Sequence, residues 1–175
     1  MSLPDERRKT SFAPVVSPET RVLILGSLPG DLSLAQHRYY AHPRNMFWHF
    51  AGRIIAEDLP ALPYDARLER LRAHRIGLWD VVAAGTRKGS LDSAIRDAAI
   101  HPLGNFCEGL PELRAIGFNG KTAAKLGRSL VDCSRYACLD LPSSSPAYAA
   151  MPVAEKEKLW LDLREYLETH ATRAH

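Results

Sequence analysis

Two segments of the sequence carry side chains suited to a planar ligand and to phosphate. Asn119 offers a hydrogen-bond donor and an acceptor on one side chain, and Phe118 before it could stack on a planar ligand. The run Ser143–Ser145 lies between two prolines and could hold a phosphate group through hydroxyls and backbone amides. Both segments also have ordinary structural interpretations, because asparagine caps helices and Ser/Pro runs are common connectors.

Two further segments are rich in glycine and in positive charge. Gly26, Pro29 and Gly30 would let backbone amides approach a ligand closely, although the segment is neither a Walker A nor a GxGxxG motif. Arg87 and Lys88 precede a Gly-Ser pair and suit a turn that contacts phosphate. A plain solvated loop fits Arg87 and Lys88 equally well.

Asp80 and Asn45 are polar residues beside apolar ones. Asp80 lies inside an apolar strand, where an unpaired carboxylate is costly, so we expect it to accept hydrogen bonds from backbone or serine groups. Asn45 stands at an expected helix start and could be its N-cap, with Phe47 and Trp48 in the core. The tyrosine pair just ahead of this helix is expected to be partly exposed packing.

The elements that must position these residues alternate along the chain. Apolar runs predict strands at 21–27, 76–82, 113–118 and 136–141, and helical patterns cover about 45–57, 65–74, 121–131 and 153–168. Near-continuous apolar runs are typical of strands buried on both faces of a parallel sheet. We therefore expect an α/β fold with three α/β/α layers and a central four-stranded parallel sheet. Ligands bind outside the carboxyl ends of such strands, which selects the loops 26–44, 83–92, 119–121 and 142–148.

Composition narrows the class of protein. The chain has 175 residues, 46% of them hydrophobic and 25% charged, which fits one globular domain at 21–170 behind an N-terminal tail at 1–20 that lies along the domain or stays mobile. No apolar run approaches the roughly 20 residues of a membrane-spanning helix, and the tail lacks the apolar core of a secretory signal. We therefore expect a cytoplasmic protein that does not contact membranes. The formal charge of +3 decides nothing about partners.

The cysteines and histidines indicate neither metal nor cofactor. Cys107, Cys133 and Cys138 form an odd set without a CxxC pair, which predicts neither a disulfide framework nor a zinc site. The histidines lack zinc-site spacing. We expect no metal and no cofactor.

Taken in order, the segments resemble one known family. The strings GSLPG, YYAHPRNMFW, GLWDVV, GSLD, FNGK and LPSSSPA follow the order found in the hypoxanthine-DNA glycosylase branch of the uracil-DNA glycosylase superfamily. The resemblance extends from about Val22 to Tyr148. It implies a four-stranded parallel sheet between helices, with loops that grip a nucleotide flipped out of the duplex. The implied activity is that of a glycosylase that hydrolytically removes a deaminated base, hypoxanthine above all, from double-stranded DNA. We expect it to be monofunctional, because no lysine stands out as a Schiff-base nucleophile, and to be a monomer.

The resemblance also implies roles for individual residues. Asn45 would be the catalytic residue that holds the attacking water. The residues expected to bound the base come from the first loop, the helix start and the third strand: Leu28, Pro29, Gly30, Phe47, Phe118 and Asn119. The residues expected to contact DNA are basic or belong to the serine-rich loop: Arg44, Arg87, Lys88, Ser143, Ser144, Ser145 and Tyr148.

The sequence departs from the family pattern in two places. Many superfamily members have Asn or Asp in the first loop, whereas this chain has Ser27-Leu28, so Asp31 is a reserve catalytic candidate. Tyr148 replaces an expected smaller polar residue. Lys121 is expected to face phosphate or solvent rather than to form a Schiff base.

The sequence leaves alternatives to hypoxanthine excision. The same fold could excise uracil or several deaminated bases, or it could be a non-catalytic nucleic-acid-binding module. An esterase built on one of the serines lacks the GxSxG motif and is disfavoured.

Overall fold

A four-stranded parallel sheet forms the centre of the protein. The computed structural model describes residues 8–168. The strands are β2 (Val22–Gly26), β3 (Ile76–Asp80), β6 (Ala115–Asn119) and β7 (Ala137–Leu141), in the order β3-β2-β6-β7. All three neighbouring pairs are parallel, so the predicted sheet is confirmed.

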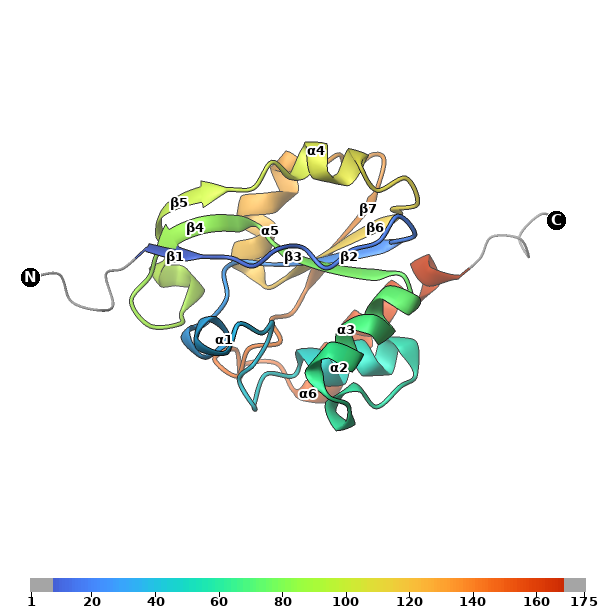
Figure 1. Ribbon diagram of the computed structural model, residues 1–175, viewed down its shortest axis with the longest axis horizontal. Coiled ribbons are helices and arrows are strands. Elements are labelled where there is room, and N and C mark those ends of the chain that lie inside the picture. Colours follow the sequence, from blue (N-terminus) through green and yellow to red (C-terminus); the bar gives the residue numbers. More distant parts are fainter. Residues whose placement is uncertain (1–7, 169–175) are drawn as a thin grey trace, which may run out of the picture.

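Helices cover both faces of this sheet (Figure 1). One face carries α2 (Phe47–Ile55), α3 (Tyr64–Ala73) and α6 (Val153–Leu161), and the other carries α4 (Leu103–Glu108) and α5 (Lys121–Gly127). Side chains of β2 alternate between the two cores: Val22 and Ile24 enter the first, and Leu23 and Leu25 enter the second. The predicted α/β/α layering is confirmed.

Several helices are shorter or more divided than their sequence patterns suggest. The predicted helix at 121–131 consists of α5 and a 3-10 turn, η4 (Arg128–Leu130), and the one at 153–168 consists of α6 and η5 (Asp162–Leu167). Short elements without a predicting pattern are α1 (Asp31–Gln36), α4, η2 (Leu59–Ala61) and η3 (Asp92–Ala94).

A second, antiparallel sheet was not predicted. It contains β1 (Arg8–Thr10), β4 (Val82–Thr86) and β5 (Arg96–Ile100) in the order β1-β4-β5. The expected loop at 83–92 therefore begins as a strand, which is a correction. The sequence signal was weak because β4 contains small residues and four of the five β5 residues are exposed.

The described part of the predicted N-terminal tail lies along the domain. Arg8–Thr10 pairs with β4, and Val15 pairs with Leu78 of β3. The indole N–H of Trp79 donates to the Phe12 carbonyl at 3.0 Å. Residues 1–7 of that tail, and 169–170 of the expected domain, lie outside the described residues.

The cysteine prediction needs a correction. Cys133 and Cys138 form a disulfide, with their Cα atoms 5.6 Å apart. A turn in which the Tyr136 N–H donates to the Asp132 carbonyl brings them together, and sequence spacing alone does not reveal such a turn. Cys107 is a buried free thiol. Among residues 8–168, no helix has the length and apolar character needed to cross a lipid bilayer.

Candidate functional site

Three neighbouring strands of the central sheet end at one polar cluster. Gly26 ends β2 and is paired in register with Asp80, the last residue of β3, while Asn119 ends β6. A Cβ atom on Gly26 would lie 2.6 Å from Asp80 Oδ1 and 3.0 Å from the hydroxyl of Tyr40. Glycine is required there because those two groups occupy the space of a side chain.

Tyr40 places an aromatic ring beside this cluster. The ring stacks on Phe47 with centroids 4.0 Å apart and planes 15° apart, and its hydroxyl accepts a hydrogen bond from Asn119 Nδ2 at 3.3 Å. Tyr40 has a positive φ of 54° and is half-buried. Sequence reasoning treated it as packing, although its place just before the HPRN segment is a usable signal.

Ser144 ties three segments of the site together. Its N–H donates to Asn119 Oδ1 at 3.0 Å, and its hydroxyl accepts from Asn119 Nδ2 at 2.9 Å. Its carbonyl accepts from the Met46 N–H at 3.0 Å, one residue before α2. The end of β6, the start of α2 and the 142–148 loop are therefore held in one arrangement.

Two side chains of helix α6 hold the 142–148 loop in place by donating hydrogen bonds to its carbonyl groups. The ammonium of Lys156 is buried, donates to the Ser143 and Tyr148 carbonyls, and lies 4.8 Å from the centre of the Tyr148 ring. The indole of Trp160 donates to the Pro142 carbonyl at 2.9 Å. Burial lowers the pKa of Lys156. Sequence reasoning missed Lys156, although a lysine one helical turn before a buried tryptophan is a detectable signal.

Asn45 lies at the start of α2, near the same loop junction. Its Oδ1 accepts a hydrogen bond from the Phe47 N–H at 2.9 Å, and the residue is half-buried. This bond satisfies one of the free amides at the helix start. Met46, and not Asn45, is the N-cap of α2, so the expected N-cap role is corrected to an Asx turn one residue earlier. A carbonyl oxygen has two lone pairs, so this bond leaves acceptor capacity on Oδ1.

The cluster contains and adjoins ionisable groups whose pKa values are shifted by burial. Burial raises the pKa of Asp80 to about 7, and repulsion from Asp92 acts in the same direction, while Arg87 opposes both. Burial also raises the pKa of Asp92, against a hydrogen bond from Ser27 and the charge of Arg87. Burial raises the pKa of the Tyr40 hydroxyl, and the negative charge of an ionised Asp80 raises it further.

Comparisons with known proteins agree with this arrangement. The family model of the Uracil DNA glycosylase superfamily matches residues 13–164. The chain belongs to the uracil DNA glycosylase superfamily. Two superfamily relatives are called hypoxanthine DNA glycosylase. The one from Methanosarcina barkeri is 46% identical over 67% of this chain and 75% of its own length. The one from Methanosarcina acetivorans is 43% identical over 79% of this chain and 87% of its own.

A solved structure supports the same membership in the superfamily. The solution NMR structure of a Methanosarcina acetivorans protein, described as a candidate uracil DNA glycosylase, matches with a TM-score of 0.83 and 39% identity. The match covers 93% of this chain and all of that one. The family resemblance inferred from the sequence motifs is confirmed.

For two residues of this superfamily member, Ser144 and Arg87, the predicted side-chain contact with DNA is corrected. Ser144 is only 1% exposed and uses its hydroxyl on Asn119, so it supports the loop from inside. Arg87 is 1% exposed and donates to the Leu28, Pro29 and Gly89 carbonyls, with Asp92 Oδ1 at 3.3 Å. Its guanidinium therefore shapes the first loop and does not reach a phosphate.

The predicted position of Phe118 beside the base is also corrected. Phe118 is fully buried in the core between the sheet and α5, because successive side chains of a strand alternate between faces. Asn119, next to it, faces the polar cluster. Phe47 is equally buried, and it reaches the site through the Tyr40 ring that stacks on it.

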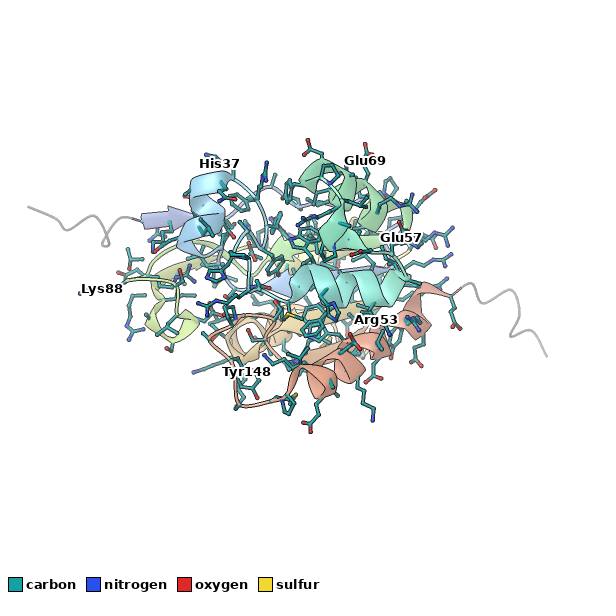
Figure 2. All side chains as sticks on the ribbon, turned by 90° about the horizontal axis from the view of Figure 1, so that it is seen from below. His37, Arg53, Glu57, Glu69, Lys88 and Tyr148 are labelled. Atoms are coloured by element: carbon teal, nitrogen blue, oxygen red, sulfur yellow. A yellow bond between two sulfur atoms is a disulfide. The ribbon has the colours of Figure 1, made fainter. Side chains whose placement is uncertain are left out.

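The remaining predicted residues lie on or near the carboxyl edge of the sheet. Leu28 and Pro29 are buried and Gly30 is half-buried beside the Ser90 hydroxyl. Arg44 and Lys88 are exposed, and Ser143, Ser145 and Tyr148 are half-buried. Figure 2 shows Lys88 and Tyr148 on the half of the molecule away from Arg53 and Glu57. The reserve candidate Asp31 is exposed and forms an ion pair with Lys9 at 2.6 Å.

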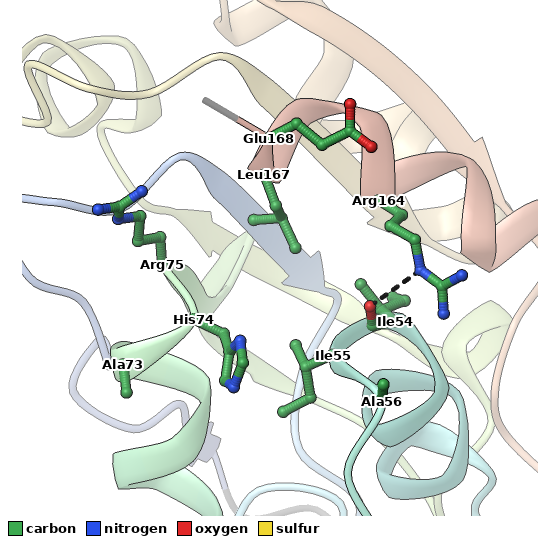
Figure 3. A pocket seen from close by; sticks show the side chains of 9 residues that line it. All are labelled: Ile54, Ile55, Ala56, Ala73, His74, Arg75, Arg164, Leu167 and Glu168. Carbon is green, nitrogen blue, oxygen red and sulfur yellow. Dashed lines mark hydrogen bonds between the residues drawn. The ribbon is translucent and has the colours of Figure 1, made fainter. Parts of the chain in front are cut away.

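A surface pocket lies elsewhere on the protein (Figure 3). It is lined by the ends of α2 and α3, by Arg75 just before β3, and by Arg164 and Leu167 of η5. Because Arg75 precedes a strand, this pocket lies at the amino edge of the sheet, away from the polar cluster. Among residues 8–168, no three His, Cys, Asp or Glu side chains gather as a metal-binding group.

Proposed function

We propose that this protein is a DNA glycosylase that flips a deaminated nucleotide out of duplex DNA and hydrolyses its glycosidic bond. Hypoxanthine is the proposed base, and an abasic site is the product. The observation that carries the proposal is the junction at Ser144, which joins three of the family motifs, FNGK, PRNMFW and LPSSSPA, around a polar cluster at the carboxyl edge of the sheet. The names of the relatives from Methanosarcina support the choice of base.

The proposed mechanism needs only weakly basic groups. Cleavage of the glycosidic bond passes through a cation-like sugar, so the attacking water requires orientation more than deprotonation. We assign that orientation to Asn45, whose Oδ1 is held in place by the Phe47 N–H. A neutral amide also avoids a second charge near the departing, negatively charged base. Flipping costs a few kcal/mol, and less at a mismatched or damaged pair, which favours the deaminated nucleotide.

The proposed contacts to the duplex come from exposed or half-buried residues. Arg44 and Lys88 are exposed cations near the proposed site, and Ser143, Ser145 and Tyr148 belong to the loop that α6 fixes. The half-buried Tyr40 ring, supported by Phe47, offers a face on which a flipped base can stack. We propose that the protein acts on DNA as a monomer in the cytoplasm.

A strand-cleavage assay tests the function. Duplexes that carry a single hypoxanthine, uracil or xanthine are incubated with the protein and then treated with alkali, which cleaves at abasic sites. We expect faster cleavage at hypoxanthine than at uracil or xanthine. Faster cleavage at uracil would select the uracil alternative. Binding without cleavage of any duplex would select the non-catalytic module.

Asn45→Ala tests the catalytic assignment. If Asn45 orients the water, the single-turnover rate on a deoxyinosine duplex should fall by roughly 100-fold or more while duplex binding is retained, comparable to the loss of one transition-state contact. If Asn45 only supports the start of α2 through the Phe47 N–H, the same change should lower stability by about 1 kcal/mol and leave the rate nearly unchanged. Melting temperature and single-turnover rate on one preparation separate the two roles. An Asn45→Ala enzyme with the original rate would contradict the assignment and direct attention to Asp31.

A further inference from the structure

Asp80 is a buried carboxyl group without a complete set of hydrogen bonds. The residue is 3% exposed, and among the described residues its Oδ2 has no hydrogen-bond partner. The expectation that backbone or serine groups would satisfy it is therefore corrected for this oxygen. A buried, unpaired ionised carboxylate is very costly in a protein, whereas a neutral carboxylic acid costs far less. Such a group at the ligand-binding edge of a sheet is a functional candidate.

The position of Asp80 connects it to the rest of the site. Its Oδ1 and the Tyr40 hydroxyl approach the same point above Gly26, in the gap left by the missing side chain. The same Tyr40 hydroxyl also accepts a hydrogen bond from Asn119 Nδ2. The carboxyl group therefore lies at the hydroxyl end of the aromatic ring proposed to stack on the base.

Burial, with the charge of Asp92 second, favours the neutral form of Asp80 below about pH 7. Asp92 of η3 repels a negative charge on Asp80, and the Arg87 guanidinium attracts it. Arg87 is shared, because it also contacts Asp92 at 3.3 Å and donates to three backbone carbonyls. Tyr39 and Tyr40, whose hydroxyls stay protonated, also interact with Asp80. Burial and Asp92 outweigh Arg87, and the pKa of Asp80 rises to about 7.

We propose that Asp80 acts in its neutral form, as a hydrogen-bond donor to the departing base. This inference rests on the proposed glycosylase function. When the C1′–N9 bond of deoxyinosine breaks, its electron pair stays on hypoxanthine, whose ring nitrogens and O6 become better acceptors. Water supplies the oxygen that joins C1′ and the proton that the base finally gains, while Asp80 keeps its own proton. An ionised Asp80 would instead repel the negative charge that develops on the base.

The pH profile of the chemical step tests this inference. Single-turnover rates on a deoxyinosine duplex are measured from pH 5.5 to 8.5 for the wild-type protein and Asp80→Asn. If the neutral acid is required, the wild-type rate follows the protonated fraction and falls towards tenfold per pH unit above about pH 7. Asp80→Asn, with a permanently neutral donor, should keep activity within about tenfold at pH 6 and lose this decline.

Two further variants keep the test decisive if Asp80→Asn folds poorly. Gly26→Ala places a methyl group 2.6 Å from the present position of Asp80 Oδ1, so it should displace the carboxyl and slow cleavage while duplex binding persists. Asp140→Asn is the matched control, because Asp140 lies on β7 with an exposed carboxylate that pairs with Arg128 at 2.6 Å. It should keep both the rate and the pH profile of the wild-type protein.

The possible outcomes separate this inference from the proposed function. A wild-type enzyme whose rate is flat to pH 8.5, or an Asp80→Asn enzyme that keeps the wild-type decline, overturns the role of Asp80 and leaves the glycosylase assignment intact. Unchanged cleavage by Gly26→Ala also overturns it. A protein that cleaves none of the modified duplexes removes the proposed function and this inference together.

Discussion

At the scale of single residues, Asn119 and Ser144 form the most closely coupled pair in the site. Asn119 accepts from the Ser144 backbone and donates to its hydroxyl, and both side chains are buried. In a buried pair of this kind, removal of one member leaves the other unsatisfied, which costs more than the bond itself contributes. A role for Asn119 in reading the base stays a prediction, and it would require at least one of these bonds to open.

Ser144→Ala measures this coupling. The variant leaves one Asn119 amide hydrogen without Ser144 Oγ, so we expect the free energy of unfolding to fall by about 1–3 kcal/mol. Ser145→Ala, in the same loop but half-buried, is the control and should change it by less than about 0.5 kcal/mol. Denaturant unfolding gives both values. Equal effects of the two variants would contradict the supporting role of Ser144.

At the scale of elements, the first loop and the segment after β4 act as one unit. Arg87 holds the first loop through the Leu28 and Pro29 carbonyls, and the Ser90 hydroxyl accepts from the Asp31 N–H. Sequence reasoning grouped Arg87 with Lys88 because adjacent basic residues in a loop look alike. The structure separates them, since one side chain points into the protein and the other into solvent.

The salt dependence of DNA binding distinguishes these two basic residues. Lys88→Ala and Arg44→Ala should each reduce the slope of log K against log salt by about 1, because each removes one proposed phosphate contact. Arg87→Met should leave the slope unchanged and lower thermal stability instead. Binding titrations at several salt concentrations, paired with melting curves, provide the readout. A slope that drops for Arg87→Met alone would reverse the assignment.

At the scale of the whole molecule, the N-terminal segment belongs to the domain. Lys9 bridges Asp31 of α1 and the Gly89 carbonyl, and Phe12 receives the indole N–H of Trp79. The segment thus braces the loop that carries Lys88, although it is distant from that loop in sequence.

A shortened chain tests this brace. Relative to a chain that begins at Arg8, one that begins at Pro14 should lose on the order of 2–4 kcal/mol of stability, from the burial of Phe12 and from lost hydrogen bonds. DNA affinity should fall with it, because the loop that carries Lys88 loses its support. Equal melting temperatures and equal affinities of the two chains would show that the segment is dispensable.

The sequence predicts those features that a local pattern of residues dictates, and it does not predict those that depend on contacts between distant segments. Strands β2, β3 and β6 of the central sheet were predictable because their apolar runs are dictated by burial on both faces. The second sheet was not, since pairing of β1 with β4 is a long-range contact between polar or small residues. Asn45 and Asn119 could be selected from motifs, whereas the burial of Arg87 and Ser144, and the face chosen by Phe118, depend on three-dimensional packing.

The strand pairings also set an order in which the chain can acquire its structure. Phe12 and Trp79, which share a hydrogen bond, lie 67 residues apart, and β2 pairs with β6 only after most of the chain is available. Long-range pairings of this kind slow folding, because loop closure precedes the contacts that reward it. During synthesis, strand β2 can pair with β3 along one edge before β6, the partner of its other edge, has been made. The nascent chain passes through a stage in which an aggregation-prone edge is open, and chaperone demand should be highest then.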